Sequence, residues 1–482
     1  MNLKVISRNT GAALLVSSLF MLFAVGISLY DGGDSALAPL LISFALTFTV
    51  GIFPFIFVRK TKEITLKDGY MIIFLSWFLS FLFGMLPYVL WGGPFTIANA
   101  WFESVSGFTT TGATILEEVE SLPRSLLFWR SSTHFIGGLG VVVFLLLIIP
   151  SSSPVRLRLT NMELNALSRD DYRSRANKTV SIFAWVYLGL FALAFFSYWA
   201  AGMSPFDAVN HAFSVCATGG FSSRNLSIGS FHSTLISVLT ILFMTLASIH
   251  FGLLFMCFVS RSLRPLYNPV VRFFLLSLAG GSIVSAISLK MQGVADTWGT
   301  AFLDATFHVV SYTSTSGLAI SDNSNWPMLP CFVLIIASLV CGCAGSTTCG
   351  LKCDRVIVLF KAIRMQILKT LYPSSVVEIR MGKRTLRSEE MYPQVLYIAL
   401  FMFLIGLSSI ICVIIGDPNQ HALLGSIASL TNVGPSLGSI GSFGNYNAEP
   451  DTLKFIFSFD MFLGRVEIYP VLAFFAGIFR KG

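Results

Sequence analysis

The chain has 482 residues, of which 54% are hydrophobic and only 12% are charged, and its mean hydropathy is +0.76. A water-soluble protein of this length needs more charge to cover its surface, so the composition excludes that class and is typical of a polytopic membrane protein. The net charge of +8 could suggest a nucleic-acid partner. Because no basic module interleaved with aromatic residues is present, we expect no nucleic-acid binding.

The positive charges are distributed unevenly along the chain. Cytoplasmic loops of membrane proteins carry an excess of Lys and Arg. The pattern therefore predicts a multi-pass protein with both termini in the cytoplasm. The expected cytoplasmic segments hold 26 of the 32 Lys and Arg residues but only 9 of the 24 Asp and Glu residues, and they are 1–10, 59–68, 151–178, 260–272, 352–390 and 480–482.

Two apolar runs open the chain, residues 11–30 and 36–58. Each is long enough to cross a hydrocarbon core about 30 Å thick as a helix. A cleaved signal peptide has a shorter apolar stretch, so we expect both runs to be retained as transmembrane helices. The eight cysteines show no pairing pattern, and we expect no disulfide framework.

A three-part unit then occurs four times. Each unit has a long apolar span, a shorter half-polar segment that ends in a glycine-containing hydroxyl motif, and a second long span. The middle segments read WFESVSGFTTTGAT, FDAVNHAFSVCATGGFSS, FLDATFHVVSYTSTSGLA and HALLGSIASLTNVGPSLG. The boundaries are 1–67 for the leading helices, 68–150 for unit one, 151–260 for unit two, 261–370 for unit three and 371–482 for unit four.

The middle segment of each unit has about 12–15 residues before its motif. That length is too short for a helix to cross the bilayer, and the segment is too apolar for an ordinary loop. Non-helical backbone survives at membrane depth only where protein buries it or where it lines a water-filled cavity. The sequence thus predicts an all-α polytopic membrane protein, with two leading helices plus four membrane–pore–membrane repeats around one channel-like, pseudo-fourfold pore. It would have ten full spans.

The four motifs offer the chemistry of a cation filter. A dehydrated alkali cation needs oxygen ligands, and backbone carbonyls supply them if the backbone alternates its geometry, which glycine tolerates. One motif alone is equally compatible with a close helix contact made by small residues. Four copies about one hundred residues apart favour the filter. The candidate residues are Thr110, Thr111, Gly112, Ala217, Thr218, Gly219, Thr315, Ser316, Gly317, Asn432, Val433 and Gly434.

Three acidic residues lie within the half-polar segments, namely Glu103, Asp207 and Asp304. Carboxylates at the outer mouth of a pore would raise the local concentration of cations. Alternatively, Asp207 and Asp304 cap the beginnings of their half-helices, where the helix dipole favours negative charge. The two roles are compatible.

The second span of unit three is interrupted by CGCAGSTTCG, residues 341–350, which contains no large side chain. Small residues can indicate close helix packing, but ten in a row favour a broken helix that lines a cavity. We interpret the stretch as an intramembrane loop and a candidate gate, centred on Gly345, Ser346, Thr347 and Thr348. Its cysteines lack a nearby histidine, so we expect small-residue packing there and no metal site.

Arg465 lies in the middle of the last apolar span. An arginine at that depth is costly and indicates a function unless another helix buries it. Glu467 follows two positions later on a different helix face, so it is a poor partner within the helix. We expect Arg465 to bond the carbonyls of the 341–350 loop and to form a barrier to cations in the closed pore.

The motifs also carry a resemblance. SGFTTTGAT, FSVCATGGFSS, STSGLA and LTNVGPSLG, together with CGCAGSTTCGLK and LGRVEIYPVL, resemble the TrkH/KtrB family of bacterial potassium-uptake membrane subunits over essentially the whole chain. The two leading spans are similar to the TrkH branch. The resemblance implies K⁺ uptake across the bacterial inner membrane, K⁺ bound at the filter ahead of each glycine, and the 341–350 loop with Arg465 as the gate.

The resemblance implies partners as well. The subunit would form a homodimer with one pore per chain, on a cytosolic ring of TrkA-type nucleotide-binding proteins that controls opening. The basic segments 151–178 and 352–390 suit such docking or are simply solvated loops.

The chain itself shows no catalytic pattern and no nucleotide fold, so we expect neither an enzyme nor a cofactor. The alternative function is a secondary carrier that couples K⁺ to H⁺ or Na⁺. Carriers commonly show inverted repeats, whereas these four units share one orientation, which favours a pore.

Overall fold

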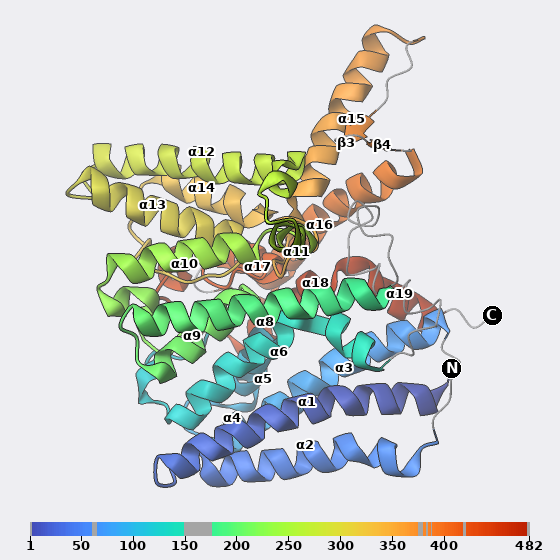
Figure 1. Ribbon diagram of the computed structural model, residues 1–482, viewed down its shortest axis with the longest axis vertical. Coiled ribbons are helices and arrows are strands. Elements are labelled where there is room, and N and C mark those ends of the chain that lie inside the picture. The colour runs from blue at the N-terminus through green and yellow to red at the C-terminus, as the bar shows by residue number, and fades with distance from the viewer. Residues whose placement is uncertain are drawn as a thin grey trace.

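The computed structural model describes residues 2–59, 65–148, 176–374, 379–381, 384–386, 388–417 and 421–479. Of the segments expected to be cytoplasmic, 480–482 and nearly all of 151–178 lie outside the described residues. Parts of 59–68 and 352–390 do so too. The chain is mostly helical, and Figure 1 shows long helices running side by side through the body.

Six of the described helices are long and apolar enough to cross a membrane, which confirms a polytopic membrane protein. Two are the leading pair, in which Gly11 packs against the Gly51 carbonyl. The other four are the first spans of the four units. In chain order they are α1 (Leu3–Tyr30), α2 (Leu37–Phe57), α3 (Leu66–Gly84) continued by α4 (Leu86–Trp91), α8 (Ala176–Ala200), α12 (Pro269–Met291) and α16 (Ser388–Ile415).

All four second spans are broken, whereas the sequence indicated a break only in unit three. In unit one, α6 (Arg124–Ile148) has left-handed backbone at Gly140, with φ 52°. In unit two, α10 (Thr234–Ala247) and α11 (Phe251–Ser260) meet at 102°. In unit four, α18 (Asp451–Val466) and α19 (Ile468–Phe479) join at Glu467, whose φ is 65°. In units one and four a single left-handed residue leaves the apolar pattern intact, so these two breaks leave little signal in the sequence.

In unit three, α14 (Met328–Leu339) and α15 (Cys353–Leu371) are separated by a loop. Two short parallel strands, β1 (Val340–Cys341) and β2 (Leu351–Lys352), close its neck. The loop proper is therefore residues 342–350. Figure 1 shows α15 running out beyond the helical body. The antiparallel strands β3 (Ile379–Met381) and β4 (Arg384–Leu386) were not expected in an all-α protein.

The four half-helices are present at the expected places. They are α5 (Ile97–Phe108), α9 (Pro205–Ala217), α13 (Trp298–Thr313) and α17 (Ala422–Thr431). Three of them begin at a capping residue whose side-chain hydroxyl accepts a backbone N–H of the first turn. These capping residues are Thr96, Ser204 and Thr297. Short 3₁₀ turns lie at Val119–Ser121, Ser227–Phe231, Arg264–Tyr267 and Gly438–Ile440.

The buried core falls into two large clusters. One joins the leading helices to units one and four, and the other joins units two and three. The clusters interlock at the half-helices, because Phe213 of unit two belongs to the first and Val433 of unit four belongs to the second. The glycine motifs therefore lie where the two halves meet.

Candidate functional site

Each half-helix ends on one residue with left-handed backbone. These residues are Thr110, Thr218, Thr315 and Asn432, with φ between 54° and 56°. Their N–H groups each donate to the carbonyl three residues back, and the next N–H donates to the carbonyl five residues back. The same hydrogen-bond pattern in all four units fixes their register independently of the sequence.

This register corrects the sequence alignment in unit two. Positive φ recurs two residues later at Gly112, Gly317 and Gly434. By the hydrogen-bond register the equivalent residue in unit two is Gly220, not Gly219 as the sequence indicated, although the φ of Gly220 is not positive. Gly219 takes the place of Thr111, and its N–H donates to the Ser214 carbonyl at 2.8 Å. The motif ATGGF contains two adjacent glycines, so sequence letters alone could not choose between them.

The four segments 110–112, 218–220, 315–317 and 432–434, called the ring below, contact one another in order. A Cβ on Gly112 would clash with the backbone of Gly220, and one on Gly220 would meet the Ser316 carbonyl. A Cβ on Gly317 would clash with the Val433 carbonyl. A Cβ on Gly434 would clash with the Thr111 carbonyl, which closes the circle. Backbone thus packs on backbone at all four contacts, where only glycine fits.

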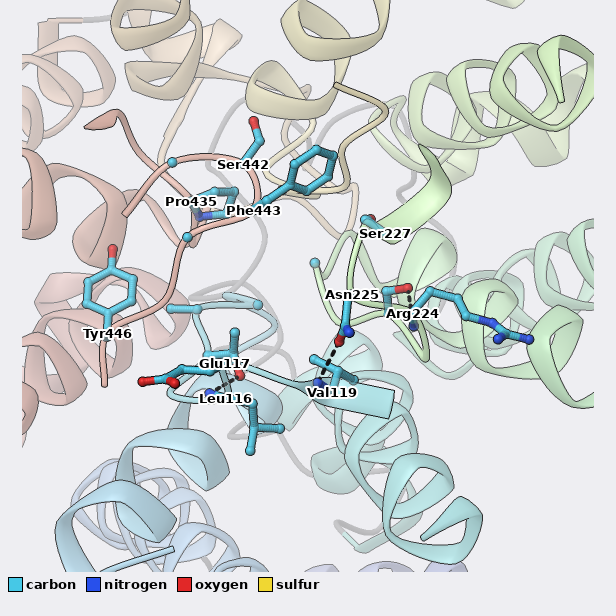
Figure 2. A pocket seen from close by; sticks show the side chains of 18 of the residues that line it. Leu116, Glu117, Val119, Arg224, Asn225, Ser227, Pro435, Ser442, Phe443 and Tyr446 are labelled. Atoms are coloured by element: carbon cyan, nitrogen blue, oxygen red, sulfur yellow. Dashed lines mark hydrogen bonds between the residues drawn. The ribbon is translucent and has the colours of Figure 1, made fainter. Parts of the chain in front are cut away.

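A mouth cavity of about 60 Å³ opens on the side of the ring that the outgoing segments line. All four units contribute to its wall, including Thr114, Ser222, Gly317 and Pro435. Figure 2 shows Glu117 and Tyr446 on one side of it and the Arg224 side chain extending away. Glu117 is exposed there, so the cavity carries an acidic group that the sequence analysis did not single out.

The three acids that were expected at the mouth do not line this cavity. Glu103 is fully buried and pairs with Arg130 at 2.6 Å. Asp207 lies in the first turn of α9 and pairs with Arg224 at 2.8 Å, but the capping residue is Ser204, whose hydroxyl accepts the Asp207 N–H. Thr297 caps α13, so neither acid is the cap that the alternative predicted. The Asp207 carboxylate raises the pKa of the Arg224 guanidinium. Asp304 is half-buried on α13.

The 342–350 loop lies directly against the opposite side of the ring. The Thr347 hydroxyl donates to the Cys216 carbonyl at 3.1 Å, next to the expected ring residue Ala217. The Cys349 N–H donates to the Thr315 hydroxyl at 3.2 Å. Within the loop, the Ser346 and Thr348 hydroxyls are 2.8 Å apart. Gly345 has a φ of 77°.

Arg465 bonds the loop as the sequence predicted. Its Nη1 donates to the Thr347 carbonyl at 2.9 Å and lies 3.1 Å from the Cys349 sulfur. Its Nη2 donates to the carbonyls of Gly137 and Gly138, just before the break in α6. One guanidinium therefore joins three units beneath the ring.

A second buried cation holds the same loop. Lys352 is 8% exposed, and its ammonium donates to the carbonyl and the hydroxyl of Thr348. The neighbouring Asp354 carboxylate accepts the Ala344 N–H at 2.8 Å. The charged residues Arg355 and Glu467 pair with each other at 2.8 Å, so Glu467 is not the partner of Arg465.

Gly220, Glu117 and Lys352 were thus missed by sequence reasoning. For Lys352 a signal existed, because it is the first charge after ten small residues and a leucine. Glu117 is the first acid after the unit-one motif. Gly220 had no independent signal.

Comparisons with known proteins agree over the whole chain. The model of the TrkH family, described as a cation transport protein, matches residues 40–481. A Trk system potassium uptake protein TrkH from Halomonas elongata is 32% identical over 485 residues and covers 100% of both chains. Its namesake from Escherichia coli is 29% identical, again over 100% of both. The crystal structure of the potassium transporter TrkH from Vibrio parahaemolyticus superposes with a TM-score of 0.88 at 27% identity, covering 100% of this chain and 99% of that one.

Proposed function

The chain belongs to the TrkH family of cation transport proteins, and we propose that it conducts K⁺ inward through the ring, with the 342–350 loop as its gate. The relatives named for potassium uptake match it from end to end. The proposal needs no cofactor in this chain, and K⁺ is the transported ion.

The observation that carries the proposal is the closed circle of four backbone segments. In the segments of units one, three and four, a left-handed residue, one of ordinary handedness and a second left-handed residue follow in turn, as from Thr110 to Gly112 and from Asn432 to Gly434. In unit two only Thr218 is left-handed. Such alternation turns successive carbonyls toward the same side, so that a circle of them can replace the hydration shell of a K⁺ ion. Thr and Ser hydroxyls add oxygens. The filter residues are those of the ring, with Gly220 added.

The gate follows from where the loop lies and from what holds it. Cys349 bonds the ring residue Thr315, and Thr347 bonds Cys216 just before the ring segment of unit two; both contacts support a loop that blocks the axis below the ring. Arg465 places a positive charge beside this blocked path, which opposes a cation. Gly345, Ser346, Thr347 and Thr348 are the gate residues, with Lys352 as a second holder.

The assembly and the topology are also part of the proposal. The name Trk system indicates partner subunits, and a cytosolic TrkA-type ring would use the exposed outer half of α15 and neighbouring basic segments. A homodimer, an inner-membrane location and cytoplasmic termini complete the proposal; the positive-inside charge pattern supports the last two.

The test is ⁸⁶Rb⁺ uptake into K⁺-loaded liposomes that contain the purified chain. A pore gives uptake that external K⁺ competes away and that persists when protonophore and Na⁺-free buffer remove both coupling gradients. Uptake that requires a H⁺ or Na⁺ gradient would replace the pore with a carrier. Liposomes without protein provide the baseline.

A further inference from the structure

Three of the four half-helices carry a buried polar side chain at the same position, seven residues before the left-handed residue. These residues are Glu103 on α5, His211 on α9 and His308 on α13, and each is 0% exposed. The equivalent residue on α17 is Gly425. The corrected register makes this correspondence visible, because an error of one residue in unit two would hide it.

Each of the first two side chains reaches across to the segment that leaves the ring. The Thr114 hydroxyl and the Ile115 N–H both donate to the Glu103 carboxylate at 3.0 Å. The His211 Nδ1 lies 2.8 Å from the Asp207 carbonyl, so this nitrogen carries the hydrogen. Its Nε2 then accepts from the Ser222 hydroxyl at 2.8 Å. Both contacts span 11 residues of chain that contain the ring segment.

The contact that His308 makes is weaker, because both of its ring nitrogens face carbonyl oxygens. The His308 Nδ1 lies 2.9 Å from the Asp304 carbonyl, and its Nε2 lies 3.1 Å from the Ser321 carbonyl. Both partners are acceptors, and a neutral imidazole has one N–H to donate. His308 therefore satisfies one of its two contacts at a time, whereas His211 satisfies both.

Unit four is held differently. A Cβ on Gly425 would clash with the Phe457 ring, so no side chain fits there. The Tyr446 hydroxyl instead donates to the Gly434 carbonyl at 2.9 Å. The Tyr312 hydroxyl of unit three donates to the Ser436 carbonyl at 2.6 Å. The outgoing segment of unit four is thus braced from outside its own half-helix.

We propose that Glu103, His211 and His308 are positioning residues that set the ion selectivity of the ring. Each ties a half-helix to its outgoing segment and so fixes the ring backbone between two anchored ends. Discrimination between cations depends on how the backbone holds its oxygens, so releasing one end loosens the cage at that unit. This inference rests on the proposed function of the ring as a filter.

The experiment measures K⁺ and Na⁺ competition against ⁸⁶Rb⁺ uptake in proteoliposomes. His211→Phe keeps an aromatic side chain of similar size at this position but removes both hydrogen bonds. We expect the preference for K⁺ over Na⁺ to fall roughly three- to tenfold, the equivalent of about one net hydrogen bond, while uptake continues. His211→Gln, whose amide can again bond the Ser222 hydroxyl, restores most of the preference. His308→Phe gives a smaller loss than His211→Phe.

The matched control is Asn210→Leu on the same half-helix. Asn210 is equally buried, but its amide donates only to the Phe206 carbonyl of its own helix, so selectivity stays at the wild-type value. Unchanged selectivity in His211→Phe would overturn the inference, as would an equal loss in Asn210→Leu. Gly112→Ala is measured in parallel. If neither His211→Phe nor Gly112→Ala changes selectivity and uptake, the filter proposal itself fails. If Gly112→Ala abolishes uptake while His211→Phe leaves selectivity unchanged, only the role of the positioning residues is overturned.

Discussion

The ring and the 342–350 loop touch each other, yet they are held by different kinds of contact. In the ring, the backbone of each unit packs on the backbone of the next through glycines such as Gly112 and Gly434. The loop is held by long charged side chains, Arg465 and Lys352, which donate to the carbonyls of neighbouring loop residues. The loop also has main-chain hydrogen bonds to the break between α10 and α11, where the Cys343 N–H donates to the Ser248 carbonyl and the Phe251 N–H donates to the Gly345 carbonyl. The four ring contacts are thus made by backbone packing, whereas the loop combines main-chain bonds with charged side chains that can rotate away.

The difference indicates which region can move. A change in the ring displaces all four segments together, because each contacts the next, and close-packed backbone offers no second arrangement. The loop can exchange its carbonyl–cation bonds for bonds to water without disturbing the ring. Under the proposed function, selectivity would depend on the main-chain packing of the ring, and opening would depend on the charged side chains that hold the loop.

Breaking the ring has the largest expected effect. In Gly112→Ala the new methyl group would clash with the Gly220 backbone, at a φ of 80° that alanine rarely adopts. We expect ⁸⁶Rb⁺ uptake to fall by more than about tenfold, since backbone strain of this kind costs about 1–3 kcal/mol before the clash is counted. The control is Gly280→Ala on α12, where nothing lies within 4 Å. Normal uptake by Gly112→Ala would show that the ring is not the ion path.

Releasing the loop has the next largest effect, in the opposite direction. Arg465→Ala removes hydrogen bonds to Thr347, Gly137 and Gly138. Of these, only the bond to Thr347 holds the loop, and a hydrogen bond from a charged group contributes about 1.5–3 kcal/mol, so we expect basal uptake by the chain alone to rise at least roughly tenfold. Arg264→Ala, at an exposed arginine, should leave uptake unchanged. A fall in uptake, with thermal stability intact, would contradict the proposal that Arg465 holds the loop closed.

Lys352→Met sharpens the same comparison with a smaller effect. Lys352 bonds a single loop residue, Thr348, whereas Arg465 joins three units. We expect basal uptake to rise roughly two- to threefold, less than for Arg465→Ala, because both hydrogen bonds of Lys352 end on a residue four positions away in the same segment and join no second unit. Because both cations hold adjacent carbonyls, the double variant with Arg465→Ala should show less than the product of the two effects. Fully multiplicative effects would mean that the two residues hold separate elements.

Much of the fold was predictable from local pattern. The four half-helices lie where short half-polar segments precede glycine motifs, and the interruption at 341–350 follows from ten small residues in a row. The breaks at Gly140 and Glu467 were not predictable, since each needs only one left-handed residue within an apolar span.

The candidate site divides in the same way. Eleven of the twelve ring residues predicted from the sequence lie within the ring segments; Ala217 precedes them, and Gly220 completes them. The contact of Arg465 with the loop was predictable because a buried arginine must find acceptors. The acids at the mouth were misplaced, because Glu103 and Asp207 pair with arginines that lie later in the same unit, Arg130 and Arg224.

Composition, charge pattern and repeats by themselves determined that this protein is a polytopic membrane protein built from four like units. Those properties depend on hydrophobicity and length, which each segment carries alone. Only the tertiary structure decided the register of Gly220, the order of the segments around the ring, and the partners of Glu103, His211 and His308. The order of the segments depends on contacts between different units, and the register and the partners depend on backbone geometry and on contacts across folded turns of up to 13 residues, which sequence letters do not record.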